Sequence, residues 1–261
     1  MKSVLAVSFL AGLALASPMM ERAKLELQAR NAARRSNRFR AAEDGGFGNI
    51  TATTVQSSNW GGAAIVTSGV TEVSGTFTIP KPSIPSGGSS RTDYCGAAWV
   101  GIDGYSNSAL IQTGVLWCVE GSSYEYEAWY EYLPAALIAY SGFSVTAGNS
   151  VTVTATKTSS NGGTTTISAN GKSASHTFSG QSTQLQGASA EWIVEDFTSG
   201  NSLVPFANFG SVTFTGATAI INGATVQASS DSPVTIDLVS SSGSVLTSTS
   251  ISGSSVAVSY V

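Results

Sequence analysis

The chain has 261 residues, of which 42% are hydrophobic and 11% charged, with 12 Lys and Arg against 16 Asp and Glu. This length allows one or two domains with a hydrophobic core, and the many aromatic and β-branched residues argue against disorder. Two cysteines and one histidine are too few for a zinc ribbon, an iron–sulfur cluster or a multi-histidine centre, and the net charge of −4 argues against a nucleic-acid surface. We therefore expect no metal, no cofactor and no nucleic-acid partner.

Residues 1–16 have the pattern of a secretory signal peptide. Lys2 precedes an apolar run from Val4 to Leu15, and small residues such as Ala16 occupy the cleavage positions. The run is too short to span a membrane, and no later stretch is long enough to do so. We therefore expect a secreted, extracellular protein with no membrane partner. A buried N-terminal helix is the alternative.

Residues 17–53 have the composition of a basic propeptide. Seven basic residues lie between Arg22 and Arg40, and the stretch from Met20 to Arg40, which lacks Pro and Gly, predicts a helix. From residue 54 onward only four basic residues stand against twelve acidic ones. Opposite charges would hold the two parts together near neutral pH, and acid would weaken this pairing by protonating carboxylates. We expect a helical propeptide that acts as an intramolecular inhibitor; a solvated basic arm is the alternative.

Residues 54–261 predict a single all-β domain. Apolar and polar residues alternate with period two in segments such as 73–79, 151–156 and 212–215. Clusters of Gly, Ser and Asn separate these segments, and we expect about a dozen strands at the spacing of a sandwich or barrel. Two packed antiparallel sheets are the default arrangement for such a chain.

The acidic residues of this domain are grouped rather than scattered. Seven of the twelve lie in three short segments: 99–104, 124–134 and 190–197. In extended strands, the residues that would share a face are Trp99 with Asp103; Glu125, Glu127 and Trp129 with Glu131; and Glu191 and Ile193 with Glu195. We interpret this pattern as a concave polar face over a packed core, where neighbouring carboxylates perturb one another's pKa values. A row of solvated acids at a sheet edge is the alternative.

Carboxylates are the best candidates for chemistry here. The single histidine, His176, lies in a polar stretch without a nucleophile motif, and the Asp-Thr-Gly and Asp-Ser-Gly loops of pepsin-like enzymes are absent. Cys95 and Cys118 should pair as a disulfide in an oxidising compartment, which would exclude a thiol peptidase; free thiols are the alternative.

Two uses of carboxylates remain open. One is glycoside hydrolysis by an acid pair such as Glu131 and Glu195, and the other is water activation by one carboxylate beside a neutral donor. A non-catalytic carbohydrate-binding sandwich, with Trp99 and Trp129 as stacking platforms, is a third reading.

Six sequence blocks occur in an order that resembles the eqolisins, the glutamic peptidases of fungi, over about residues 54–261. The blocks are SNWGG at 58–62, AWVGIDG at 98–104, LIQTGV at 110–115, AWYEY at 128–132, AEWIVEDF at 190–197 and VPFANF at 204–209. The resemblance implies a lectin- and glucanase-like sandwich, or jelly roll, of two curved antiparallel sheets. It also implies an acid endopeptidase that acts on polypeptide substrates, and we expect a monomer.

The resemblance further implies a catalytic dyad of Gln112 and Glu195. The residues that match positions lining or supporting the cleft are Trp99, Asp103, Glu127, Trp129 and Glu131. Two residues depart from the family pattern: Glu127 stands in place of an Asp, and Leu133 replaces an aromatic residue before Pro134.

The side chains of the implied dyad suit peptide hydrolysis in acid. Glu195 would take a proton from water as the water attacks the scissile carbonyl, and would then donate it to the leaving nitrogen. Gln112 is neutral at every relevant pH, so its amide can always donate to the developing oxyanion. No covalent intermediate is needed.

Overall fold

The computed structural model describes residues 34–35, 37–41, 54–200 and 202–261. Within these ranges the regular structure is entirely β. The strands are β1 Arg34–Arg35, β2 Thr54–Ser57, β3 Trp60–Val66, β4 Val70–Thr78, β5 Tyr94–Ile102, β6 Ile111–Glu120, β7 Ser123–Tyr132, β8 Ile138–Ala139, β9 Ser150–Ser159, β10 Gly162–Ala169, β11 Lys172–Phe178, β12 Ser189–Glu195, β13 Thr198–Ser199, β14 Ser202–Leu203, β15 Ser211–Ile221, β16 Ala224–Gln227, β17 Val234–Leu238, β18 Thr247–Ser252 and β19 Ser255–Tyr260.

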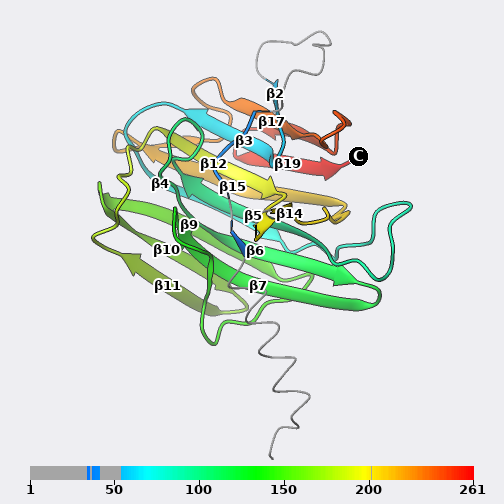
Figure 1. Cartoon of the computed structure of the whole chain (residues 1–261). Coiled ribbons are helices and arrows are strands. Elements are labelled where there is room, and N and C mark those ends of the chain that lie inside the picture. The colour runs from blue at the N-terminus through cyan, green and yellow to red at the C-terminus, as the bar shows by residue number, and fades with distance from the viewer. Residues whose placement is uncertain (1–33, 36, 42–53, 201) are drawn as a thin grey trace, which may run out of the picture.

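Two large sheets form the body of the molecule (Figure 1). The first has the order β2-β17-β3-β12-β5-β6-β7-β8, and the second has the order β11-β10-β9-β4-β15-β19-β18, with β16 also paired to β15. This confirms the predicted all-β body. The strand pairs are antiparallel except for β2 and β17, which are parallel; β17 lies between β2 and β3 and is antiparallel to β3. The expectation of purely antiparallel sheets is therefore wrong at this edge.

A hydrophobic core lies between the two sheets. Val73 and Phe77 of β4 belong to the same buried cluster as Val100 of β5 and Trp192 of β12. These residues alternate with outward-facing ones along each strand, as the period of two predicts. Burial of this apolar surface is the main stabilising term for a two-layer fold.

A second buried cluster covers the opposite face of the first sheet. It contains Trp60, Trp99, Trp129 and Ile193, and every residue of β12 is buried because both faces of that strand are covered. The predicted grouping of carboxylates and tryptophans on this face is confirmed, but Glu195 is completely buried and not solvated. The alternative of a solvated acidic edge is contradicted for this strand.

The described part of the leader is extended and crosses the first sheet's outer face. β1 pairs with β13, and β13 pairs with β14, in a small separate sheet. The helix predicted over Met20–Arg40 is wrong at residues 34–35 and 37–40, and the rest of it lies outside the described residues, as does the predicted signal peptide. Helix propensities differ by less than about 1 kcal/mol per residue, so hydrogen bonds to the body can override them.

No helix in the described ranges has the length and apolarity needed to cross a membrane. His176 of β11 is half-buried and stacks on the ring of Tyr130, with 4.1 Å between ring centroids. Tyr130 alternates with Trp129 and Glu131 along β7, so the histidine lies on the other side of the sheet from the grouped carboxylates.

Candidate active site

The grouped acids lie in a grid on the outer face of the first sheet. Cross-strand pairing aligns β12, β5, β6 and β7 in three rows. In that strand order the rows are Glu191, Gly101, Gln112 and Glu131; Ile193, Trp99, Gly114 and Trp129; and Glu195, Ala97, Leu116 and Glu127. Directly paired residues share a face, so the predicted common faces of β7 and β12 are confirmed and belong to one surface.

Gln112 lies in the first row of this grid, on β6, and Glu195 lies in the third row, on β12. They are on strands separated by β5, where their partners Gly101 and Ala97 are four residues apart. The row between them contains Trp99, whose side chain contacts Glu195.

The indole of Trp99 spans the distance between Gln112 and Glu195. Its Nε1 donates a 2.8 Å hydrogen bond to Oε2 of Glu195, and both residues are fully buried. At its other end, Cζ3 lies only 2.9 Å from where a Cβ on Gly101 would be, and the Gln112 Cβ is 3.3 Å from that same point. A side chain at Gly101 would displace the indole, so this glycine allows Trp99 to reach from beside Gln112 to Glu195.

Gln112 is held by Glu131. Its Nε2 donates a 2.6 Å hydrogen bond to Oε2 of Glu131, and both side chains are buried. A carboxylate can only accept, so this contact fixes which end of the amide is the nitrogen. An amide nitrogen carries two N–H donors, and this contact uses one of them. Two residues predicted separately, as a dyad member and as a supporting acid, are therefore direct partners.

Asp103 lies just after β5, not within it, and its side chain holds two loops together. It follows the end of β5 with φ 73, so the predicted alternation with Trp99 stops at Ile102. Its carboxylate accepts backbone N–H groups of Gln186 at 2.7 Å and Ala188 at 2.8 Å, and the Asn107 side-chain amide at 2.8 Å. It thereby ties the loop after β5 to the segment that leads into β12.

Two neutralised acids lie close to this site. Glu191 is fully buried, and burial together with nearby Asp103 raises its pKa well above 4.5, although the Ser189 side chain acts in the opposite direction. Burial and the adjacent Glu195 raise the pKa of Asp196 to about 8. Both groups are therefore protonated in acid, which removes two negative charges from around Glu195.

The leader enters the site itself. The backbone N–H of Asn37 donates to Oε1 of Glu195 at 2.8 Å, and the indole Nε1 of Trp60 donates to the Asn37 carbonyl at 2.8 Å. The side chain of Asn37 also donates to the hydroxyl of Thr198 at 3.3 Å. Both oxygens of Glu195 thus accept hydrogen bonds, one from Trp99 and one from the leader.

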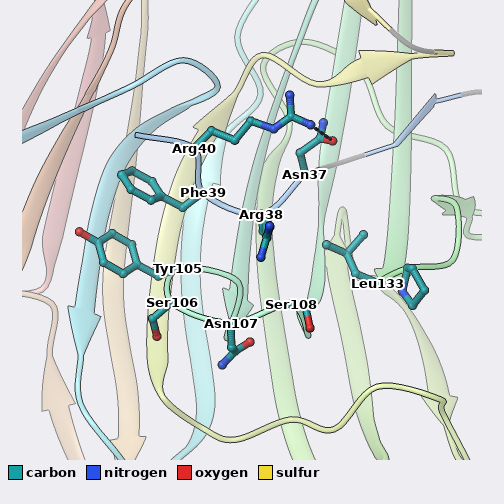
Figure 2. A pocket seen from close by; sticks show the side chains of 10 residues that line it. Asn37, Arg38, Phe39, Arg40, Tyr105, Ser106, Asn107, Ser108 and Leu133 are labelled. Atoms are coloured by element: carbon teal, nitrogen blue, oxygen red, sulfur yellow. Dashed lines mark hydrogen bonds between the residues drawn. The ribbon is translucent and has the colours of Figure 1, made fainter. Parts of the chain in front are cut away.

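A cavity of about 610 Å³ remains beside the leader. It is lined by Asn37, Arg38, Phe39, Arg40, Tyr105, Ser106, Asn107, Ser108, Leu133 and Pro134. Figure 2 shows Arg38 pointing into this space and Leu133 at its far side. Leu133, one of the two departures from the family pattern, therefore lines this cavity.

The remaining predicted residues are near the site or beneath it. Trp129 is fully buried in the middle row, and Glu127 is half-buried at the end of the third. Cys95 and Cys118 form a disulfide between paired positions of β5 and β6, which confirms that prediction. The Asp93 carboxylate lies near these two sulfurs, in a group that could otherwise bind a metal ion. Metal binding requires thiolates, and the sulfurs of a disulfide are not thiolates.

Two residues without a predicted role, Asn59 and Trp60, contact the leader. Asn59 and Trp60 are fully buried, and both hydrogen-bond leader backbone groups. The SNWGG block at 58–62 was the available signal, because it contains both residues. Its contact surface arises from β3 pairing with β12, where Trp60 lies beside Glu195.

The chain is similar to known peptidases over most of its length. The profile of the peptidase A4 family matches residues 58–260. The chain is 41% identical to aspergillopepsin-2 of Aspergillus niger over 281 aligned positions, which cover 99% of each protein.

Solved structures give the same result. A crystal structure of scytalido-glutamic peptidase with a transition-state analogue inhibitor has a TM-score of 0.70 and 35% identity, covering 78% of this chain and 98% of that one. A structure of SCP-B, described as an eqolisin in complex with the tripeptide Ala-Ile-His, has a TM-score of 0.65 and 33% identity over the same shares.

Proposed function

The chain belongs to the peptidase A4 family, the eqolisins, and is a glutamic endopeptidase; we propose that Glu195 and Gln112 are its reacting pair. The observation that carries this assignment is the position of Glu195. It is a buried carboxylate, oriented by Trp99 and reached by a peptide N–H of the leader. The tripeptide in the SCP-B structure supports polypeptides as substrates.

Glu195 acts first as a base. Hydrogen bonds to a carboxylate favour its charged form. Trp99 donates one such bond to Glu195, and its indole N–H does not ionise at any relevant pH. Water bound to Oε1, the oxygen that the leader N–H occupies, transfers a proton to Glu195 while its oxygen attacks the scissile carbonyl. This forms a tetrahedral intermediate and neutral Glu195.

Gln112 stabilises the oxyanion of that intermediate. Its Nε2 donates one hydrogen bond to Glu131, which fixes the orientation of the amide. In the mechanism that we propose, Nε2 donates its second hydrogen bond to the substrate oxygen. Such a donor typically contributes about 3–4 kcal/mol to lowering the barrier. Glu195 then donates its proton to the leaving nitrogen as the C–N bond breaks, which restores its carboxylate without a covalent intermediate.

The supporting residues act through these two. Trp129 and Glu127 complete the grid beside Trp99 and Glu131, and we assign them to the substrate-facing wall of the cleft. Asp103 holds the loop that forms one end of the cleft, since it binds three backbone N–H groups from residues 186–188.

The leader is an intramolecular inhibitor in this account. Asn37 occupies Oε1 of Glu195, so a bound leader excludes the attacking water. We assign residues 1–16 to a signal peptide, 17–53 to the propeptide and 54–261 to the secreted, monomeric peptidase. The Cys95–Cys118 disulfide supports passage through an oxidising compartment. Incubating the full chain at falling pH and sequencing the new N-terminus tests release of the leader; an unprocessed chain with full activity would contradict it.

A double-mutant cycle tests the reacting pair. Gln112→Ala and Glu195→Gln should each lower kcat by about 10²-fold or more on denatured protein at acid pH. The double variant should be little worse than the worse single variant, because groups that act as a unit are not additive. Multiplicative losses would refute the pairing. Hydrolysis of β-glucan instead of protein would favour the two-carboxylate glycosidase, which the bond between Glu131 and Gln112 disfavours.

A further inference from the structure

We infer that the cleft contains an aromatic subsite, formed by Tyr105 and Trp60, for the third substrate residue after the cleaved bond. In the full chain Phe39 fills this subsite. The inference rests on the proposed function, because it takes the position of Glu195 as the point from which substrate residues are counted.

The leader binds through backbone groups that any extended peptide has. Glu195 accepts the N–H of Asn37, Trp60 donates to the carbonyl of the same residue, and the carbonyl of Gly104 accepts the N–H of Phe39 at 3.1 Å. None of these contacts depends on the leader's side chains. A substrate in the same direction can therefore make the contacts with Trp60 and Gly104, while the attacking water takes the place of the N–H at Glu195.

Asn59 extends this backbone recognition to the next residues. Its Nδ2 donates to the carbonyl of Arg38 at 3.1 Å, and its Oδ1 accepts the N–H of Arg40 at 3.1 Å. The single side-chain amide of Asn59 thus pairs with a carbonyl and an N–H that lie two residues apart in the leader, as the backbone of a neighbouring strand would. Asn59 is completely buried and its Oδ1 also accepts the Ser57 hydroxyl, so it is preorganised for this contact.

Among leader residues 37–41, Phe39 packs on aromatic residues of the body. Its ring stacks on Tyr105 with centroids 4.5 Å apart and planes at 23°, and meets Trp60 edge-on at 5.9 Å. Figure 2 shows the Phe39 and Tyr105 rings side by side. The neighbouring Arg38 and Arg40 are exposed, and Arg40 bonds to Asn37 within the leader itself. The body therefore selects for an aromatic ring at this position.

The register follows from the chemistry of Glu195. This carboxyl must reach the leaving nitrogen in order to protonate it, and the nitrogen it reaches in the leader is that of Asn37. Asn37 therefore takes the place of the first residue after the cleaved bond. Arg38 takes the second place, and Phe39 takes the third.

A matched set of quenched fluorescent peptides tests the subsite. The peptides share one sequence and differ only in Phe, Leu, Ala or Asp at the third position after the cleaved bond, which mass spectrometry locates for each product. The acid-activated protein should cleave the Phe peptide with a kcat/KM about tenfold above that for the Ala peptide, because the ring gains stacking and burial. Most of this difference should lie in KM, since the contact is remote from the reacting atoms.

Variants of Tyr105 assign the preference to the proposed pocket. Tyr105→Ala should reduce the Phe-over-Ala ratio to about twofold, whereas Tyr105→Phe should keep it because stacking uses the ring and not the hydroxyl. Tyr124→Ala removes an exposed ring on β7 and serves as the control that leaves the ratio unchanged. Cleavage of the Ala peptide by all three variants shows that they are folded.

A synthetic peptide with the sequence of residues 34–41 provides a second readout. It should inhibit competitively, and its Phe39→Ala form should bind about tenfold more weakly, while Phe39→Tyr binds about equally. A Phe-over-Ala ratio below twofold in the wild type, or one that survives Tyr105→Ala, would overturn the inference. Failure of the proposed function is distinct from this outcome, because it would appear as full activity of Glu195→Gln on every peptide.

Discussion

Asp196 should make the folded protein lose stability as the pH rises, and Asp196→Asn should remove much of that loss. The side chain is 7% exposed, and its Oδ1 has no hydrogen-bond partner in the described ranges. Burial and the neighbouring Glu195 raise its pKa from 3.8 to about 8. The unfolded chain therefore releases this proton above pH 3.8, whereas the folded protein holds it until about pH 8.

The sign and size of the effect follow from this difference. The folded state binds more protons than the unfolded state between these pH values, so the free energy of unfolding falls as the pH rises through the interval. Each unit of pKa corresponds to about 1.4 kcal/mol, so the loss approaches ~5 kcal/mol at pH 8. A domain of this kind has a total stability of about 5–15 kcal/mol, so this one carboxyl can decide whether it stays folded at neutral pH.

Urea unfolding followed by tryptophan fluorescence measures the effect. The full chain carrying Gln112→Ala, which limits self-digestion, is compared with the same chain carrying Gln112→Ala and Asp196→Asn together at several values between pH 4 and 8. The two should be about equally stable at pH 4, and Asp196→Asn should be several kcal/mol more stable at pH 8. The exposed Asp231→Asn is the control and should follow the parent. Parallel loss of stability in the parent and in Asp196→Asn would refute the reasoning.

Trp99→Phe keeps a ring but removes the hydrogen bond to Glu195, so it should lower kcat/KM about 10- to 100-fold and change the pH–rate profile, which a loss of packing alone would not do. Replacing Cys95 and Cys118 together by Ala opens a link across 23 residues, and should lower the free energy of unfolding by about 3 kcal/mol in urea titrations. Glu191→Gln should retain activity in acid, where the native carboxyl is neutral, and should lose less stability than wild type as the pH rises toward neutrality, since burial raises the pKa of Glu191. Unchanged kinetics of Trp99→Phe would contradict the first expectation, and unchanged stability without the disulfide would contradict the second. An inactive Glu191→Gln enzyme in acid would contradict the third.

Local alternation made much of the grid predictable. The side chains of Glu127, Trp129 and Glu131 point to one face because each strand alternates with a period of two, whatever it pairs with. The same holds for Glu191 and Glu195 on β12. The rule stopped at Asp103, because its positive φ ends the strand and redirects the carboxylate to backbone N–H groups.

Contacts between distant segments were beyond the reach of such patterns. The bond between Gln112 and Glu131 depends on the register of β6 against β7, which alternation alone does not fix. The leader has a helical composition, but Asn37 reaches Glu195 across 158 residues of sequence. Asn59 hydrogen-bonds the backbone of the leader, so its role could be recognised only once the positions of both segments were known.

The rate at which Glu195→Gln cleaves one quenched fluorescent peptide at acid pH, measured beside its affinity for that peptide, tests the central claim most directly. The substitution keeps the size of the side chain and removes the proton acceptor. The affinity should stay within about threefold of wild type, and kcat should fall by at least ~10²-fold, because the base acts on the water and not on the bound ground state. A near wild-type rate for Glu195→Gln would contradict the account.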